Sequence, residues 1–146
     1  MKRRLLVGES MGYQFDFEKL IEYDLRQSGI SFNVALKFGE DKASISANVD
    51  TGASFCIFER KHGENLGLEI ESGLRQRVAT VTSSFIVYGF SLTISVANFE
   101  FDSFVYFAAD ESFSKNVLGR QGWLDKILLG VNDYEGKLYL SKQEWL

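Results

Sequence analysis

From residue 31 onward the chain consists of short segments in which apolar and polar residues alternate, separated by residues that favour turns. The first segment, 31–36, is followed by a turn sequence at 39–42 and by a second alternating segment, 43–49. Successive side chains of a β-strand point to opposite faces of a sheet, so this alternation indicates strands with one buried face. The two segments therefore predict a β-hairpin that ends at Asp50.

Seven further segments have the composition of short strands, and several are separated by turn residues such as Gly89, Asn98 and the sequence 133–136. They are Phe55–Phe58, Leu74–Thr82, Phe85–Tyr88, Phe90–Val96, Phe99–Phe107, Ile127–Val131 and Lys137–Leu140. Many short strands with few helices predict an all-β fold, a small closed or nearly closed antiparallel barrel.

Helical signals are few. The best is Glu59–Leu66, which Gly67 would end, and Gly122–Lys126 predicts one or two helical turns between the last strands. Residues 14–27 are ambiguous: their apolar spacing allows a short helix before Gly29, whereas Phe15 and Phe17 alternate as in a strand. We favour the helix, and we treat 1–30 as an N-terminal extension of uncertain structure.

Length and composition limit the classes of protein to consider. The 146 residues suit one domain, and 45% of them are hydrophobic, which argues against disorder. The net charge of −4 gives no general attraction to nucleic acid or to anionic lipid. Because no apolar run reaches the length of a membrane span, we expect a soluble, cytoplasmic protein that binds neither nucleic acid nor membranes.

The two residues most often found in nucleophilic and zinc sites occur once each, as Cys56 and His62. A single cysteine excludes an intrachain disulfide and a cysteine-based zinc cluster. Cys56 lies in an apolar run and His62 in a polar one, so a buried structural thiol and a solvated helix face explain them better than a Cys-His dyad or a Ser-His-Asp triad. We expect neither a metal nor a cofactor.

One segment, Ala47–Ser54, places an acidic residue where an apolar strand ends. Asp50 is followed by Thr51, by Gly52 and by two small residues. Glycine two residues after the carboxylate permits a tight turn in which backbone comes close to it, and small residues leave room for a substrate. The spacing suits a catalytic acid, although a bare Asp-Thr-Gly also occurs as an ordinary turn.

A second segment, Asn116–Leu124, supports a functional role for Asp50, because it places two apolar residues before Gly119-Arg120 and a short helix signal. Together, Asp50–Ser54 and Val117–Arg120 resemble the paired signature of the retropepsin-like aspartic peptidases, which include viral and bacterial members. The resemblance covers roughly the last three-quarters of the chain. Further matching segments are Leu66–Leu68, Tyr88-Gly89, Val105–Ala108, Gly119–Trp123 and Lys137–Leu140.

The resemblance implies that 31–146 form a retropepsin domain, an acid-protease barrel in which the Asp50 loop crosses the Leu118-Gly119 strand. It also implies a flap, a hairpin that closes over substrate, which we place on Arg77–Tyr88 with the chain reversal at Thr82–Ser84. Viral flaps usually carry glycines at the tip, and this one has none. The expected substrate-binding flap residues are Val81, Thr82, Ser83, Ser84 and Phe85.

The activity implied by the resemblance is that of an aspartic endopeptidase acting on peptides or proteins. In the family each of two protomers supplies one catalytic Asp, and this sequence has one Asp-Thr-Gly, so an active member must be a homodimer with Asp50 at the two-fold axis. One carboxylate would accept a proton from a bound water while the other donates to the developing oxyanion, with no acyl-enzyme and no metal.

The resemblance assigns supporting roles to the neighbours of Asp50. Thr51 would donate its hydroxyl across the two-fold axis, and Gly52 would aim its amide at the carboxylate. Arg120 corresponds to the family arginine that braces the dimer, but Ser54 stands where viral members often carry its acidic partner. The full expected set of supporting residues is Thr51, Gly52, Ala53, Ser54, Gly119 and Arg120. The Trp145-Leu146 end is a further candidate for the dimer interface.

Two other functions fit the same residues. The first is a catalytically degenerate member of the fold that serves as a dimerisation or peptide-binding module. The second is a small ligand-binding barrel in which the Asp50 turn is accidental. An aspartyl-phosphate enzyme is excluded, since its motif has lysine after the aspartate and its chain is far longer. The intact Asp-Thr-Gly favours the active peptidase.

Overall fold

The computed structural model describes residues 2–7 and 10–143. The strands are β1 (Lys2–Val7), β2 (Ser10–Phe15), β3 (Lys19–Glu22), β4 (Ser31–Phe38), β5 (Asp41–Val49), β6 (Ile57–Phe58), β7 (Leu74–Ala79), β8 (Ser84–Val96), β9 (Phe99–Ala108), β10 (Val117–Leu118), β11 (Ile127–Asn132) and β12 (Lys137–Lys142). The helices are α1 (Arg60–Asn65) and the 3-10 turns η1 (Ile70–Ser72) and η2 (Leu124–Lys126). The Trp145-Leu146 end lies outside the described residues.

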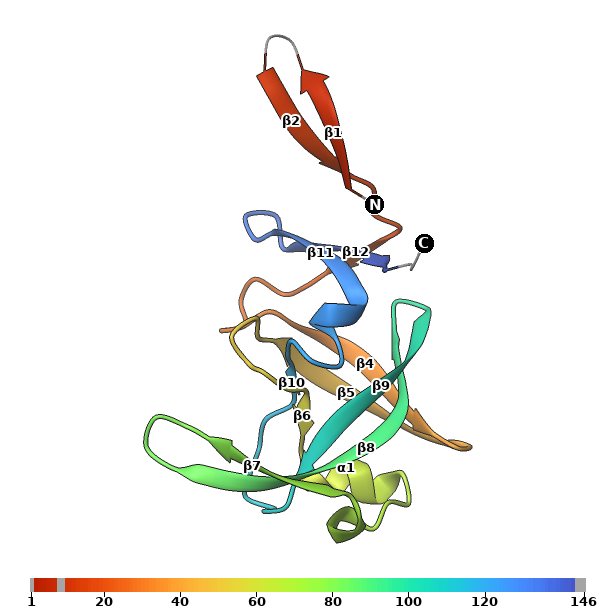
Figure 1. Ribbon diagram of the computed structural model, residues 1–146, viewed down its shortest axis with the longest axis vertical. Helices are drawn as coiled ribbons and strands as arrows, with labels where there is room; N and C mark the ends of the chain where they lie inside the picture. The colour runs from red at the N-terminus through yellow and green to blue at the C-terminus, as the bar shows by residue number, and fades with distance from the viewer. Residues whose placement is uncertain (1, 8–9, 144–146) are drawn as a thin grey trace.

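The body of the molecule is a ring of strands (Figure 1). Hydrogen bonding follows the order β4-β5-β10-β6-β9-β8, and the pairing of β4 with β8 closes the ring. β7 pairs only with β8 and therefore forms an edge strand. The all-β class with little helix is confirmed. The ring is mixed rather than wholly antiparallel, because β10 runs parallel to β5 and β6 runs parallel to β9.

The interior of the ring holds the hydrophobic core. Alternate residues of β4 and β5 are buried, which is the pattern that the sequence predicts for this hairpin. Trp123, Phe58 and Phe107 are the largest side chains with almost no exposed surface. Trp123 stacks obliquely on Phe32 at 5.8 Å between ring centroids, so the segment after β10 is anchored in the core.

Two glycines that the sequence suggests as interruptions of a strand and of a helix lie inside these elements and have packing roles. The predicted strands 85–88 and 90–96, which Gly89 separates in the sequence, form one continuous strand, β8. Gly89 makes room for an aromatic ring, since an added Cβ there would lie 2.4 Å from Phe104. Gly63 lies within α1, where an added Cβ would lie 2.6 Å from Ile70. In both places a missing side chain allows close packing rather than a turn.

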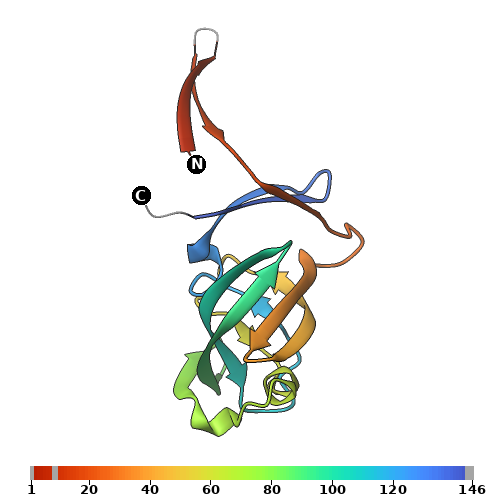
Figure 2. The ribbon, with the colours of Figure 1, turned by 90° about the vertical axis from the view of Figure 1, so that its right-hand side faces the viewer.

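The expected helix in 14–27 is wrong. β2 ends at Phe15, and β3 pairs antiparallel with β12 to make the sheet β11-β12-β3. Pairing with β12 satisfies the backbone of β3, and this tertiary interaction overrides an ambiguous local pattern. The hairpin β1-β2 stands away from the body in both views (Figures 1 and 2). The division of the chain at residue 31 stays a prediction, although β3 belongs to a sheet with the C-terminal strands.

Candidate active site

Asp50 lies directly after β5, on a loop that the backbone holds at both ends. Its N–H donates to the carbonyl of Leu118 at 3.0 Å, and its carbonyl accepts the N–H of Ala53 at 3.1 Å. The N–H of Gly52 donates to Oδ1 of Asp50 at 2.9 Å, as the resemblance implies. The bond to Leu118 fixes the end of β5, and the bonds from Ala53 and Gly52 shape a tight turn around the carboxylate.

The loop after Asp50 crosses the segment that follows β10. Arg120 N–H donates to the carbonyl of Ala53 at 2.8 Å, and Gln121 N–H donates to the carbonyl of Ser54 at 2.9 Å. Gly119 immediately precedes these two residues, and an added Cβ there would be 2.2 Å from the carbonyl oxygen of Phe55. No side chain fits at so short a separation, which explains why this crossing needs glycine.

Cys56 lies beneath the same crossing. Its thiol has no exposed surface, accepts the N–H of Gly119 at 3.4 Å and points its hydrogen toward the carbonyl of Gln121 at 3.5 Å. Burial raises the pKa of this thiol to about 12, so it stays protonated at neutral pH. Cys56 is therefore a structural residue, which is the interpretation favoured by the sequence.

The tip of the Asp50 loop is open in one copy of the chain. Asp50, Thr51 and Gly52 are exposed, and within the described ranges 2–7 and 10–143 the hydroxyl of Thr51 makes no hydrogen bond. The Thr51 hydroxyl, which has no partner in the described part of the chain, and the exposed Asp50 carboxylate, whose Oδ1 accepts only the Gly52 N–H, are both available to a molecule outside the chain. The described part of the chain contains no cluster of three or more potential metal-ligating His, Cys, Asp and Glu side chains.

The segment in which we expect the flap is the hairpin of β7 and β8, with the reversal at Thr80–Ser83 rather than at Thr82–Ser84. Val81, Thr82 and Ser83 lie in this turn, whereas Ser84 begins β8. The Thr80 hydroxyl contacts both the carbonyl and the N–H of Ser83 at 3.0 Å. A side-chain clasp thus closes the turn, and no residue of it has a positive φ, which is why the tip needs no glycine.

Phe85, the fifth flap residue expected from the sequence, has a different environment. Its ring stacks on Phe113 at 5.2 Å between centroids, and it packs with a small cluster of buried residues around Ile57 and Tyr106. This contact ties the flap strand to the loop after β9. Phe85 therefore lies just below the turn, paired with Val78, and its ring packs against the body instead of extending from the tip.

A cavity of about 280 Å³ separates the flap from the Asp50 loop. Its walls are Gly52, Ala53, Ser54, Phe55, Ile57, Arg77, Val78 and Ala79. The small residues after Asp50 form one wall and the edge strand β7 forms the other. Sequence patterns identified Gly52, Ala53 and Ser54 of the first wall. Arg77 begins the segment in which the flap was expected, but neither Arg77 nor Ile57 was among the expected site residues, since their place in the cavity depends on how the hairpin folds over the loop.

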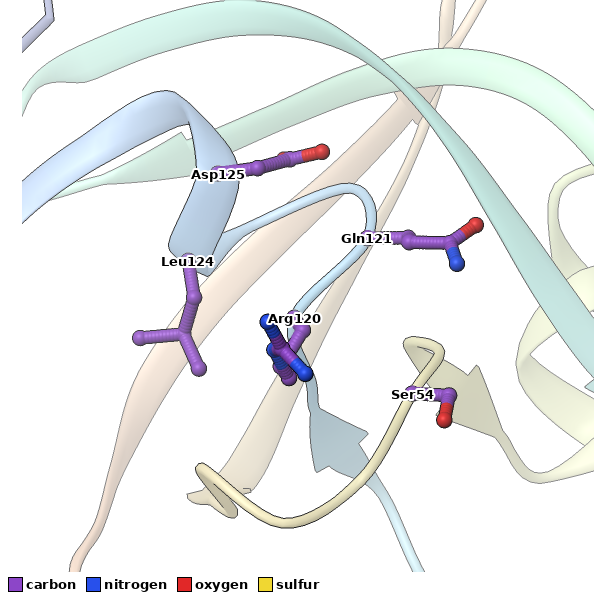
Figure 3. Close-up of a pocket in the computed structure, with 5 residues that line it drawn as sticks. All are labelled: Ser54, Arg120, Gln121, Leu124 and Asp125. Atoms are coloured by element: carbon purple, nitrogen blue, oxygen red, sulfur yellow. The ribbon is translucent and has the colours of Figure 1, made fainter.

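Arg120 lines a neighbouring cavity of about 360 Å³ together with Ser54, Gln121, Leu124 and Asp125 (Figure 3). Ser54 comes from the Asp50 loop, Arg120 and Gln121 follow β10, and the other two belong to η2. Among the described residues the Arg120 guanidinium has no ion pair, and the carboxylate that shares its cavity, Asp125, accepts the N–H of Gly122 at 3.0 Å. The bracing role stays a prediction.

The chain is similar to known proteins in both sequence and fold. Residues 34–132 match the sequence model of a protein family described as aspartyl protease. The fold is similar to that of a retropepsin-like aspartic protease from Rickettsia conorii, with a TM-score of 0.62 and 18% identity over 83% of this chain and 96% of that one. It is also similar to the EIAV protease in complex with the inhibitor HBY-793, with a TM-score of 0.52 and 16% identity over 68% and 88%. No curated protein sequence matches.

Proposed function

This chain belongs to the aspartyl protease family, and we propose that it is an endopeptidase that cleaves peptide bonds as a homodimer, with Asp50 of each copy supplying half of the catalytic pair. The observation that carries the proposal is the Asp50 loop. It presents one exposed carboxylate that is bonded to Gly52 N–H and held at a crossing with Gly119. The match of the family model, 34–132, spans both segments.

A second copy is needed because one carboxylate cannot perform the reaction. Two carboxylates about 3 Å apart cannot both ionise, so the pair shares one proton, as aspartic proteases do as a class. The ionised member takes a proton from the attacking water, and the protonated member donates to the oxyanion as it forms. One described copy contains a single Asp-Thr-Gly loop, so the partner must provide the other member.

The unused hydroxyl of Thr51 supports the same arrangement. It is exposed at the loop tip and bonds to nothing in the described part of its own chain. In a pair related by a two-fold axis each Thr51 can donate to the opposing loop, which would hold the two carboxylates in register. The bond would be made at both loops at once because the interface is symmetric.

Substrate would lie in the cavity between the Asp50 loop and the flap. β7 is an edge strand that borders the cavity, so its outer side is not hydrogen-bonded to another strand. An extended peptide can pair with such an edge, which is how many proteins hold a peptide as an added strand. The geometry therefore suits a peptide substrate bound in the extended form.

The proposal is tested by digesting a peptide library with the wild-type chain and with Asp50→Asn. The substitution keeps the side-chain volume but removes the shared proton, so cleavage should stop while the circular dichroism spectrum and the dimer mass stay unchanged. Pepstatin, a generic inhibitor of aspartic peptidases, should likewise stop cleavage by the wild-type chain. Undiminished cleavage by Asp50→Asn would end the assignment, and peptide binding without any cleavage would favour the degenerate module.

A further inference from the structure

The cavity between the flap and the Asp50 loop has one charged side chain in its walls, and that side chain is a cation. Arg77 stands among glycine, alanine, serine and apolar residues, and no acidic residue lines this cavity. The protein as a whole carries a net charge of −4. A guanidinium at the substrate cleft of an acidic protein is a local reversal of charge, and a cleft with low-dielectric walls concentrates such a field.

The Arg77 guanidinium forms no ion pair with a carboxylate of the described residues. Its cross-strand neighbour on β8 is Ile86, and Nη1 donates to the hydroxyl of Ser84 at 3.1 Å. Within residues 2–7 and 10–143 the guanidinium takes part in no ion pair, whereas Arg60, outside the cleft, pairs with both Glu64 and Glu71. A guanidinium has five N–H donors, so most of those on Arg77 remain available.

Arg77 borders the cavity in which we expect substrate to lie. β7 is the edge of its sheet, and residues from both of its faces, Arg77 and Val78, border the cavity. Val78 packs inward against the cluster around Ile57, while Arg77 is exposed. A peptide laid along this edge would place one side chain beside the guanidinium. The bond to Ser84 holds that guanidinium near the tip of the flap.

We propose that Arg77 selects an acidic side chain in the substrate, so that the enzyme prefers peptides with Glu or Asp at one position beside the flap. The inference rests on the proposed function, since it concerns the same cleft. A planar guanidinium binds a carboxylate through two parallel N–H···O bonds, which distinguishes Glu from the isosteric Gln. The site is open to solvent, so added salt should weaken the preference.

The test uses a cleaved peptide in which each position in turn carries Glu or Gln. For wild type, kcat/KM at one position should be about tenfold higher for Glu, a difference in transition-state free energy of about 1.4 kcal/mol. Arg77→Gln should bring the Glu/Gln ratio to about one, and Arg77→Glu should favour Lys at that position over Gln. An equal rate for Glu and Gln at every position, or a ratio that survives Arg77→Gln, would overturn the inference.

Arg75→Gln is the matched control. Arg75 lies two residues away on the same face of β7, is exposed and does not line the cavity. Its replacement removes the same charge from the flap but should keep the Glu/Gln ratio of wild type. If Arg75→Gln lowers the ratio as much as Arg77→Gln does, the preference comes from the general charge of the flap, and the assignment to Arg77 is wrong.

Two readouts separate this inference from the proposed function. If cleavage depends on Asp50 but the Glu/Gln ratio of kcat/KM is one at every position, the preference assigned to Arg77 is wrong and the proposed peptidase function stands. Fluorescence anisotropy with labelled peptides and the Asp50→Asn variant measures the same preference in Kd without turnover. A preference for Glu that Arg77→Gln removes would support the inference even if no peptide were cleaved, and failure to bind any peptide would overturn it.

Discussion

Replacing Gly119 by alanine tests the crossing that holds the catalytic loop. The added Cβ would lie 2.2 Å from the carbonyl oxygen of Phe55 and 2.8 Å from that of Ala53, and both neighbours are backbone atoms that no rotamer change can move. Relief needs a separation of the two segments by about 1 Å, since unstrained C···O contacts lie beyond about 3 Å. The bonds from Arg120 N–H and Gln121 N–H across the crossing would then be weakened.

The expected loss of stability follows from these contacts. Overpacking a tight site costs about 1–3 kcal/mol, and two weakened hydrogen bonds add about 0.5–1.5 kcal/mol each. The free energy of unfolding should therefore fall by about 2–6 kcal/mol, a large share of the roughly 5–15 kcal/mol typical of a domain. Tm should fall by on the order of 10 °C at fixed protein concentration.

The assay is urea unfolding at one protein concentration, followed by tryptophan fluorescence. Gly29→Ala is the control, because an added Cβ there meets only ordinary contacts, the closest 3.5 Å from Oδ1 of Asn48. A Gly119→Ala variant within about 0.5 kcal/mol of both the wild type and the control would refute the reasoning. The crossing would then have enough freedom to accept a side chain, and it could not hold Asp50 in a fixed position.

Three further substitutions or measurements test separate parts of the account. Thr51→Val should raise the dimer dissociation constant by about tenfold or more, since it strands the acceptor of a buried bond in each loop, and an unchanged constant from sedimentation would remove that role. Thr80→Val deletes the clasp at the flap tip and should increase amide hydrogen exchange at 80–83 while leaving exchange in β9 unchanged; equal protection in wild type and variant would count against the clasp. Cys56 should resist thiol reagents at pH 8 until the chain is unfolded, because its pKa of about 12 keeps the folded thiol protonated, and rapid labelling of the native protein would show that the thiol is accessible. The unfolded thiol ionises near its ordinary pKa of about 8.5, so Cys56 should also make stability fall as pH rises above about 9.

Residues whose role follows from local pattern could be predicted from sequence. Asp50 and Gly52 form a turn that neighbouring residues dictate, and the alternation in 31–49 predicts a hairpin that the structure confirms. Gly119 was also identifiable, although the reason for it, contact with the backbone of Phe55, is visible only in the folded chain.

Features that depend on pairing between distant segments could not be predicted. β3 forms a strand because it pairs with β12, which lies more than a hundred residues later in the chain. The local sequence of β3 does not indicate this pairing. The chain reversal was expected at Thr82–Ser84, whereas the Thr80 hydroxyl bonds to Ser83 and closes the turn at Thr80–Ser83. Several polar residues of this stretch could make such a bond, and the register of β7 against β8 decides which one does. Arg77 borders the cleft only because the flap folds back over the Asp50 loop.

Whether two copies of Asp50 make one active site can be measured by mixing wild type with Asp50→Asn at constant total protein and allowing subunits to exchange. If each site needs both carboxylates, activity follows the square of the wild-type fraction, and an equal mixture retains about a quarter of the wild-type activity. If each chain carries a complete site, activity is proportional to the wild-type fraction and the equal mixture retains about half. The quadratic curve is the result we expect, and a straight line would contradict the shared site.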